Sequence, residues 1–179
     1  MANATYNATC YQSDQAAPAC TQAGVPRTIR GSVAFTAALA TSDTVNLVRL
    51  PANHRVTGLK FQFSELDSGT TVTVNVGAQA TGTTYDDADA YIAASTLFRA
   101  ASTLVFPTSG ATGTGNPATF WTGPAGAGTP NVDYDVVLTL GAGPSTATTG
   151  TIRFEIEYAS ELTVIKDGST SPSVVSGTQ

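Results

Sequence analysis

Alternation of apolar and polar residues is the feature of this sequence that most narrows its possible folds. The segment 71–77 places three valines on one side of an extended chain, with threonine and asparagine on the other. Segments 131–140 and 151–158 repeat this pattern with larger apolar residues. Because successive side chains of a β-strand point to opposite faces, each segment predicts a strand with one buried face.

Four further segments show the same pattern, with Gly, Pro, Asp and Ser between them: 29–37, 43–50, 55–63 and 161–166. Turn residues between short alternating segments are typical of strands joined by tight connections. Seven or more strands with one apolar face each must bury those faces against one another. The sequence therefore predicts an all-β fold, an antiparallel β-sandwich or jelly roll.

One segment, 86–95, departs from this rhythm. It is rich in alanine, begins with acidic residues, and spaces Ala88, Tyr91, Ile92 and Ser95 as on one side of a helix. Acidic residues favour a helix N-terminus. We therefore expect a short helix here, followed by an extended return.

The ends of the chain differ in composition from the middle. A length of 179 residues fits one domain. Residues 1–26 lack apolar periodicity and predict an extended N-terminal arm, which must pack on the domain or on a neighbouring subunit to become ordered. Residues 27–167 form the predicted jelly-roll domain, and 168–179 a flexible C-terminal tail. Residues 107–130 read as a long loop with one short strand.

Charged residues are scarce, and this bears on the partners of the chain. Asp, Glu, Lys and Arg make up 12% of the residues, against about 25% in an ordinary soluble domain. The polar surface must therefore consist of hydroxyl, amide and glycine groups, which suits a protein that is part of a larger assembly. With a net charge of −5 and scattered arginines, the sequence argues against direct binding of nucleic acid or of an anionic membrane.

The first residues and the two cysteines bear on the compartment. Residues 1–6 show neither the basic nor the apolar region of a secretory signal, and no apolar run reaches the roughly 20 residues of a membrane-spanning helix. We therefore expect synthesis in a cytoplasm. Cys10 and Cys20 are either free thiols of the arm or a disulfide that contributes about 2–3 kcal/mol once the protein has left that reducing compartment.

The search for catalytic residues favours a protein that is not an enzyme. His54 is the only histidine, and it follows a Leu-Pro-Ala-Asn turn, so we expect an exposed turn residue rather than a catalytic base. Two pairs of acids, Glu155 with Glu157 and Asp133 with Asp135, share strand faces as a glycosidase pair would. The same alternation is found on any solvent-facing strand.

Two smaller groups complete the search. Lys60 and Arg153 are placed to neutralise the acids of neighbouring strands. Asp86, Asp87 and Asp89 could bind calcium, but they lack the glycine and the final glutamate of an EF-hand loop, so we interpret them as helix N-terminal acids. We expect no cofactor and no metal.

Several segments resemble the capsid decoration (cement) proteins of tailed bacteriophages. Residues 43–52 match a strand that ends in a Leu-Pro-small turn, and 55–59 begin the next strand. Residues 66–77 match an Asp-Ser-Gly turn followed by a valine-rich strand. Residues 86–96 match an acidic, alanine-rich segment, and 150–158 resemble the closing strand.

The resemblance covers residues 43–158 and implies a structural virion protein on the outer surface of the phage head. It implies that the chain binds the major capsid protein and itself, as a homotrimer, and stabilises the lattice. Tyr6 and Tyr11 of the arm would then be aromatic anchors of this contact. The alternative is a head-fibre, tail or adhesin-type module that binds host glycan through Phe120 and Trp121 at a loop tip.

Overall fold

The computed structural model describes residues 4–19, 25–35, 39–65, 67, 71–80, 83, 85–106, 130–143 and 149–160, with the backbone alone at 102 and 104–106. Within these ranges the chain forms nine strands and one short 3₁₀ turn, η1 (Leu97–Arg99). The strands are β1 (Thr5–Asn7), β2 (Arg27–Phe35), β3 (Thr44–Leu50), β4 (His54–Phe63), β5 (Thr73–Gln79), β6 (Asp87–Ser95), β7 (Ser102–Phe106), β8 (Tyr134–Ala142) and β9 (Gly150–Ser160). No helix in the described part of the chain has the length and apolarity to cross a membrane.

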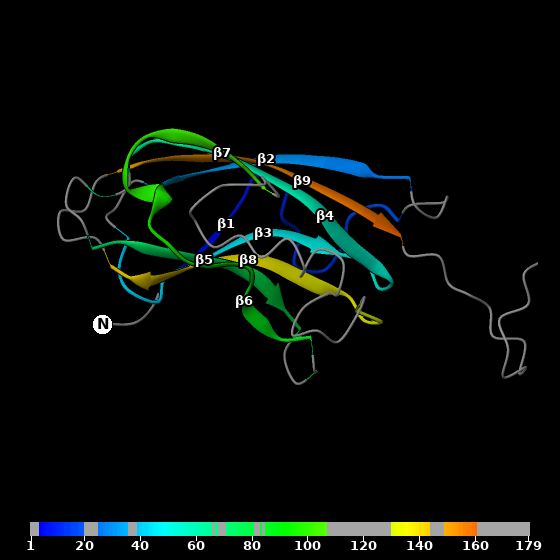
Figure 1. Ribbon diagram of the computed structural model, residues 1–179. Helices are drawn as coiled ribbons and strands as arrows, with labels where there is room; N and C mark the ends of the chain where they lie inside the picture. The colour runs from blue at the N-terminus through cyan, green and yellow to red at the C-terminus, as the bar shows by residue number, and fades with distance from the viewer. Residues whose placement is uncertain are drawn as a thin grey trace, which may run out of the picture.

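The strands form two facing sheets (Figure 1). One sheet has the order β1-β3-β8-β5-β6 and the other β2-β9-β4-β7. Strands β2 to β9 pair antiparallel, and β1 joins β3 in parallel. Consecutive strands from β2 to β9 alternate between the sheets, except β5 and β6, which are neighbours in the larger sheet. This is the topology of an eight-stranded jelly roll. The predicted all-β sandwich is confirmed.

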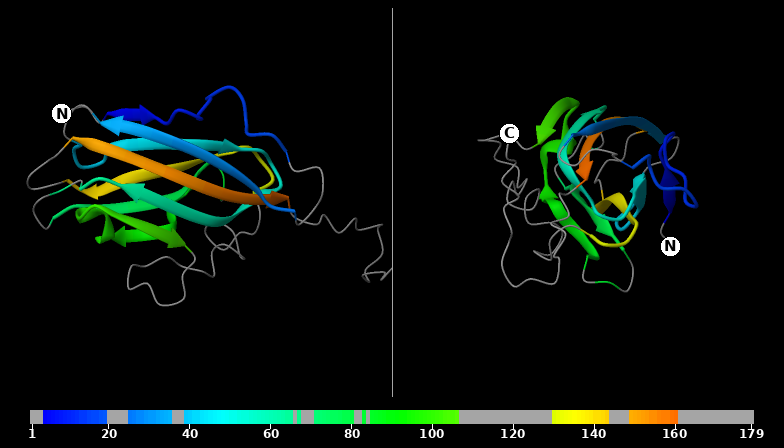
Figure 2. Two further views of the ribbon diagram at one scale, coloured as in Figure 1. Left: turned by 90° about the horizontal axis from the view of Figure 1, so that it is seen from above. Right: turned by 90° about the vertical axis from the view of Figure 1, so that its right-hand side faces the viewer.

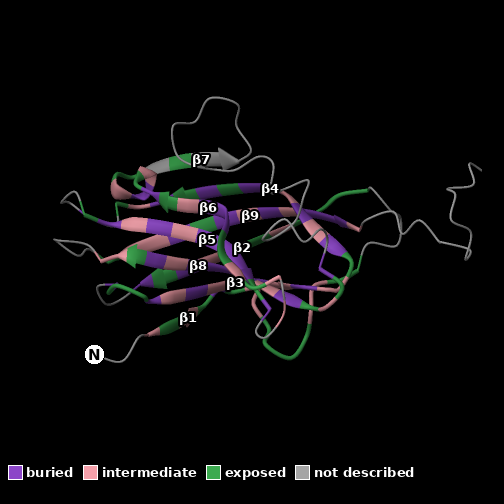
Figure 3. Cartoon of the chain, turned by 60° about the horizontal axis from the view of Figure 1, so that its bottom comes forward, coloured by how far each residue is buried: buried purple, intermediate pink, exposed green. Residues whose placement is uncertain are grey.

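The core lies between the sheets and consists of the inward side of each alternating strand. Along β9, for example, Ile152, Phe154, Ile156 and Tyr158 are buried, while the residues between them are partly or fully exposed. Figure 3 shows the same alternation along the strands of the larger sheet. Full burial of one such side chain contributes roughly 1.5–3 kcal/mol, so this pattern fixes which face of each strand turns inward.

The helix predicted over 86–95 is wrong, because this segment is strand β6 at the edge of the larger sheet. Ala90, Tyr91 and Ile92 are buried consecutively, and the pairing of β6 with β5 shifts register twice. Such irregularities break the period of two and produce a spacing that imitates a helix. Ala94, with a φ of 46°, adds a further bend. The helical turn follows later, as η1.

Asp67 is fixed to the residues that lead into β5. It is buried, and its Oδ2 accepts hydrogen bonds from the backbone N–H groups of Thr71 (3.0 Å) and Val72 (3.1 Å). One side chain therefore satisfies two backbone donors ahead of β5, as an aspartate in a turn can. Of the Asp-Ser-Gly segment, only Asp67 lies among the described residues. The predicted strand 161–166, the tail and nearly all of the predicted loop 107–130 lie outside the described residues.

Gly77 of β5 lies closer to its neighbouring strand than any side chain would permit. A Cβ atom at this position would lie 2.1 Å from the Asp87 carbonyl oxygen and 2.3 Å from the Ala88 carbonyl carbon, both of them backbone atoms of β6. Backbone cannot move aside as a flexible side chain can. The close approach of β5 and β6 therefore depends on glycine here.

We predict that Gly77→Ala lowers the free energy of unfolding by about 3 kcal/mol, the upper end of the usual cost of overpacking. Gly141→Ala is the matched control, because its Cβ would meet mainly the Thr73 hydroxyl group at 2.9 Å, which can rotate away. We expect this control to lose less than about 1 kcal/mol. Chemical denaturation of both variants is the measurement, and equal losses would contradict the prediction.

A candidate interaction surface

The first described residues form an additional strand on the edge of the larger sheet. Strand β1 pairs with β3 in parallel, with Thr5 opposite Thr44. Just before it, the Ala4 N–H donates to the Asp43 carboxylate at 2.8 Å, and the Thr44 N–H donates to the Ala4 carbonyl group at 3.0 Å. The second oxygen of Asp43 accepts from the Ala40 N–H at 2.7 Å. Buried Asp43 thereby joins two separate stretches of chain.

After β1 the chain crosses from one sheet to the other within two residues. The Ala8 N–H donates to the carbonyl group of Asn46 in β3 at 3.0 Å, and the Thr9 N–H donates to that of Ser32 in β2 at 2.9 Å. The Ser32 N–H returns a bond to the Thr9 hydroxyl group at 3.1 Å. Figure 2 shows this segment along one open side of the sandwich, where it links β3 and β2, which lie in different sheets.

Side chains fix the rest of this segment to the domain. The Tyr6 ring packs edge-on against Phe35, with centroids 5.2 Å apart. The Tyr11 hydroxyl group donates to Asp135 Oδ2 at 3.1 Å, and the Tyr158 hydroxyl group donates to the Pro18 carbonyl group at 2.7 Å. The arm expected from the sequence thus lies on its own domain over residues 4–19. The capsid contact assigned to Tyr6 and Tyr11 stays a prediction.

Cys10 lies half-buried within this segment, and its Sγ donates to the Leu47 carbonyl group at 3.4 Å. Gly31 makes room for it, since a Cβ there would lie 2.6 Å from Cys10 Sγ and 2.5 Å from the Phe154 ring. Burial raises the pKa of the Cys10 thiol, which lowers its reactivity. Cys20 lies outside the described residues, so the alternative of a disulfide stays a prediction.

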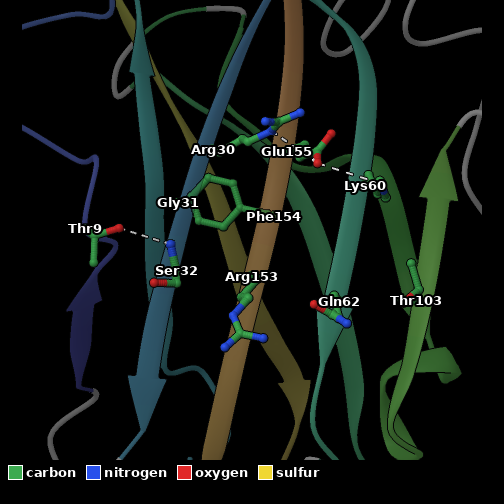
Figure 4. Close-up of a pocket in the computed structure, with 10 residues that line it drawn as sticks. All are labelled: Thr9, Arg30, Gly31, Ser32, Lys60, Gln62, Thr103, Arg153, Phe154 and Glu155. Carbon is green, nitrogen blue, oxygen red and sulfur yellow. Dashed lines mark hydrogen bonds and ion pairs between the residues drawn. The ribbon is translucent and has the colours of Figure 1, made fainter.

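A hollow of about 530 Å³ opens on the outer face of the smaller sheet (Figure 4). Strand register builds it from two rows of cross-strand neighbours. One row consists of Arg30, Glu155 and Lys60. The other row crosses all four strands of the smaller sheet. The members of this second row are Ser32, Arg153, Gln62 and Thr103. Thr9 of the N-terminal segment closes one end.

The charges of the hollow do not balance. Glu155 Oε1 pairs with Arg30 Nε at 3.2 Å and with Lys60 Nζ at 3.7 Å. This confirms the expected role of Lys60 and adds Arg30, which the sequence did not indicate. The same role expected of Arg153 is wrong for the described residues. In the part of the chain that the structure describes, no carboxylate lies within ion-pair distance of Arg153. The hollow therefore presents excess positive charge on a protein of net charge −5.

Three of the four acids considered for catalysis, Glu155, Asp133 and Asp135, have structural partners. Glu155 holds two cations, as described above, and Glu157 follows it on the outer face of β9. Asp133 Oδ1 accepts from the Ala52 N–H at 2.9 Å, and Asp133 Oδ2 lies 4.0 Å from Arg49 Nε. These acids support turns and strand pairs. Within the described ranges, no three His, Cys, Asp or Glu side chains converge as metal ligands would.

Asp135 is half-buried beside Asp133, and burial, together with the charge of that neighbour, raises the pKa of its carboxyl group. The hydrogen bond from Tyr11 and the charge of Arg49 act in the opposite direction but do not cancel this effect. Asp135 therefore carries its charge at neutral pH at some cost to the folded state. The same carboxylate helps to attach the N-terminal segment, because it accepts the hydrogen bond from the Tyr11 hydroxyl group.

The expectation of an exposed turn histidine is wrong. The His54 side chain is buried, and its Nδ1 lies 2.8 Å from the Ala52 carbonyl oxygen, so Nδ1 carries the proton. Its ring lies 6.0 Å from that of Tyr158. The turn is real, with Asn53 at a φ of 60°, but β4 begins at His54 itself and directs the ring inward. The role of His54 is therefore in packing.

Asp87 and Asp89 lie on edge strand β6 and not at a helix N-terminus, so that interpretation is also wrong. The Asp89 N–H donates to Asp87 Oδ1 at 3.4 Å. A hydrogen bond with the Asp87 side chain, burial and the charge of Asp87 raise the pKa of Asp89. Together with exposed Asp86, they make one acidic end of this edge. Phe120 and Trp121, the proposed loop-tip contacts, lie outside the described residues.

We predict that Asp135→Asn stabilises the fold at pH 7, because the amide has the shape of the carboxyl group without its buried charge. Because the folded-state pKa is raised, the contribution of Asp135 to stability is complete below its unfolded pKa of about 3.9 and is lost as the pH rises through the folded value. The gain in melting temperature should therefore shrink as the pH falls toward 4.

Asp14→Asn is the control, since it removes the same charge from an exposed site. We expect this change to alter stability by less than about 0.5 kcal/mol at any pH. Thermal denaturation between pH 4 and pH 8 measures both variants. An Asp135→Asn protein that melts below the wild type at pH 7 would show that the charged form is favoured.

Comparison with known proteins gives a shared fold. No family model and no curated protein matches the chain. A chain from the capsid of Ralstonia phage GP4 is similar in structure, with a TM-score of 0.66 and 22% identity, over 88% of this chain and 98% of that chain. A chain from the capsid asymmetric unit of cyanophage Pam1 gives a TM-score of 0.52 and 23% identity, over 83% and 94%. At this identity the likeness shows the fold, which is one that these phage capsids contain.

Proposed function

We propose that this protein is a structural component of a tailed-phage virion, a decoration protein that binds the outside of the head and stabilises the lattice of the major capsid protein. One observation carries the proposal. The likeness to the chain from the Ralstonia phage GP4 capsid spans 98% of that chain, so it concerns a whole capsid chain and not a shared fragment.

The surface chemistry of the described strands supports the proposal. Away from the hollow, several outward positions carry uncharged polar residues, as at Thr28, Asn46 and Asn75. Such groups make hydrogen bonds in close contacts without the cost of burying charge. A chain with 12% charged residues is better suited to repeated contacts in an assembly than to life as a free monomer.

The decoration role itself rests on the segments that resemble cement proteins. In the structure these segments form β3, the turn before β4, part of β4, and strands β5, β6 and β9. They belong to the frame of the jelly roll rather than to a loop, so the resemblance extends to how the domain is built. The proposed partners are the major capsid protein and further copies of this chain, as a homotrimer on the outer surface.

We expect purified particles of the virus that encodes this chain to contain it in a fixed ratio to the major capsid protein, as counted by quantitative mass spectrometry. Gold-labelled antibodies against the chain should mark heads in electron micrographs. Label confined to tails or fibres would contradict the decoration role and favour the glycan-binding alternative. Absence of the chain from particles would contradict both.

A second test uses particles that lack the gene. Such heads should lose their DNA at a lower temperature than wild-type heads, and purified full-length protein added back should restore the difference. Heads that take up the protein without becoming more stable would contradict the stabilising role. A nucleic-acid stain that reports DNA release on heating is a sufficient readout.

A further inference from the structure

The outer face of the smaller sheet concentrates positive charge on a protein that has little of it. Three of the eight basic residues of the chain line the hollow, Arg30, Lys60 and Arg153, and one carboxylate, Glu155, lies among them. Glu155 pairs with both cations of the Arg30–Lys60 row and leaves that row with one net positive charge. Arg153 lies in the neighbouring row, between uncharged side chains, and its guanidinium group has no carboxylate partner in the described chain.

The neighbours of Arg153 are suited to binding a carboxylate. Ser32 and Gln62 are its cross-strand partners, and Thr103 continues the row. Hydroxyl and amide groups donate hydrogen bonds to an oxygen that a guanidinium group already attracts. Figure 4 shows Arg153 between Ser32 and Gln62, with Thr103 beyond Gln62. The site is open enough to admit a side chain from another molecule.

The complementary feature lies elsewhere on the same chain. An acidic group, Asp86, Asp87 and Asp89, lies at the beginning of β6, which is the edge strand of the larger sheet among the described residues. Asp86 and Asp89 are exposed, and Asp87 and Asp89 are close enough to repel each other. A cation brought to this edge would relieve that repulsion.

The two features cannot meet within one molecule. The acidic edge belongs to the larger sheet, whereas the hollow is on the outward side of the smaller sheet. We propose that the hollow around Arg153 receives the acidic edge Asp86–Asp89 of a second copy of this chain. The guanidinium group and the hydroxyl and amide groups of its row bind the carboxylates.

Such a contact joins two different surfaces, the hollow of one copy and the acidic edge of another. A pair of copies therefore still offers one hollow and one acidic edge to further copies. Contacts of this kind generate a closed ring or a continuing array. Because both surfaces are exposed, salt should weaken the contact, with a screening length of about 10 Å at 0.1 M. The inference deepens the self-association included in the proposed function, and it does not require binding to a head.

The test measures association of the full-length protein by sedimentation at low and high salt. Arg153→Glu should weaken self-association at least about tenfold, and so should Asp87→Lys with Asp89→Lys, since each change places like charges together. Mixing the two variants should restore association, because the reversed charges again match. Arg27→Glu and Asp14→Lys are controls that reverse exposed charges outside both surfaces.

Arg153→Gln is a control for misfolding, because it removes the charge without reversing it. It should weaken association less than Arg153→Glu does, and its melting temperature should equal that of the wild type. A wild-type protein that stays monomeric, an Arg153→Glu protein that associates as the wild type does, or a mixture that fails to associate would each overturn the inference. So would an acidic oligosaccharide that binds the hollow of a monomeric protein. If phage heads bind the monomeric protein, the proposed binding to the head remains, although the inference about self-association fails.

Discussion

Burial of one apolar face of each sheet against the other is the constraint on which the rest of the structure depends. Two facing sheets leave two open sides, and the chain covers both. On one side residues 4–19 bridge β3 and β2, with Ala8 buried between them. On the other side η1 joins β6 to β7 and inserts Phe98, which stacks on Phe63 at 4.5 Å and meets Phe61 edge-on at 5.5 Å. Each cover is a local segment that completes the core.

The strands that could be predicted are those whose side chains alternate without interruption. Strands β2, β3, β4, β8 and β9 match the predicted segments to within a few residues, because burial on one face leaves a period of two in the sequence. Strand β6 was missed because it combines two register shifts with alanines on both faces, Ala88 exposed and Ala90 buried, so its two faces differ little in character. The bridging role of residues 4–19 depends on contacts with residues 23 to 140 positions away, which no local pattern records.

The charged hollow shows a second limit of sequence reasoning. Alternation indicates that Arg153 and Glu155 face outward together, but it leaves open which residues of the adjacent strands lie beside them. Pairing register decides this, and it sets Arg30 and Lys60 on either side of Glu155 while Arg153 falls between Ser32 and Gln62. A shift of two residues in either pair would have given Arg153 a different set of neighbours.

The course of the N-terminal segment has a mechanical consequence. Tension applied to the chain ahead of β1 acts first on Ala4 and Asp43, then on the parallel pairing with β3, and then through Thr9 on β2. These contacts are loaded in series, so the chain must leave β3 of the larger sheet before the pull reaches β2 of the smaller one. Forced unfolding from this end therefore starts in one sheet and spreads to the other only through Thr9.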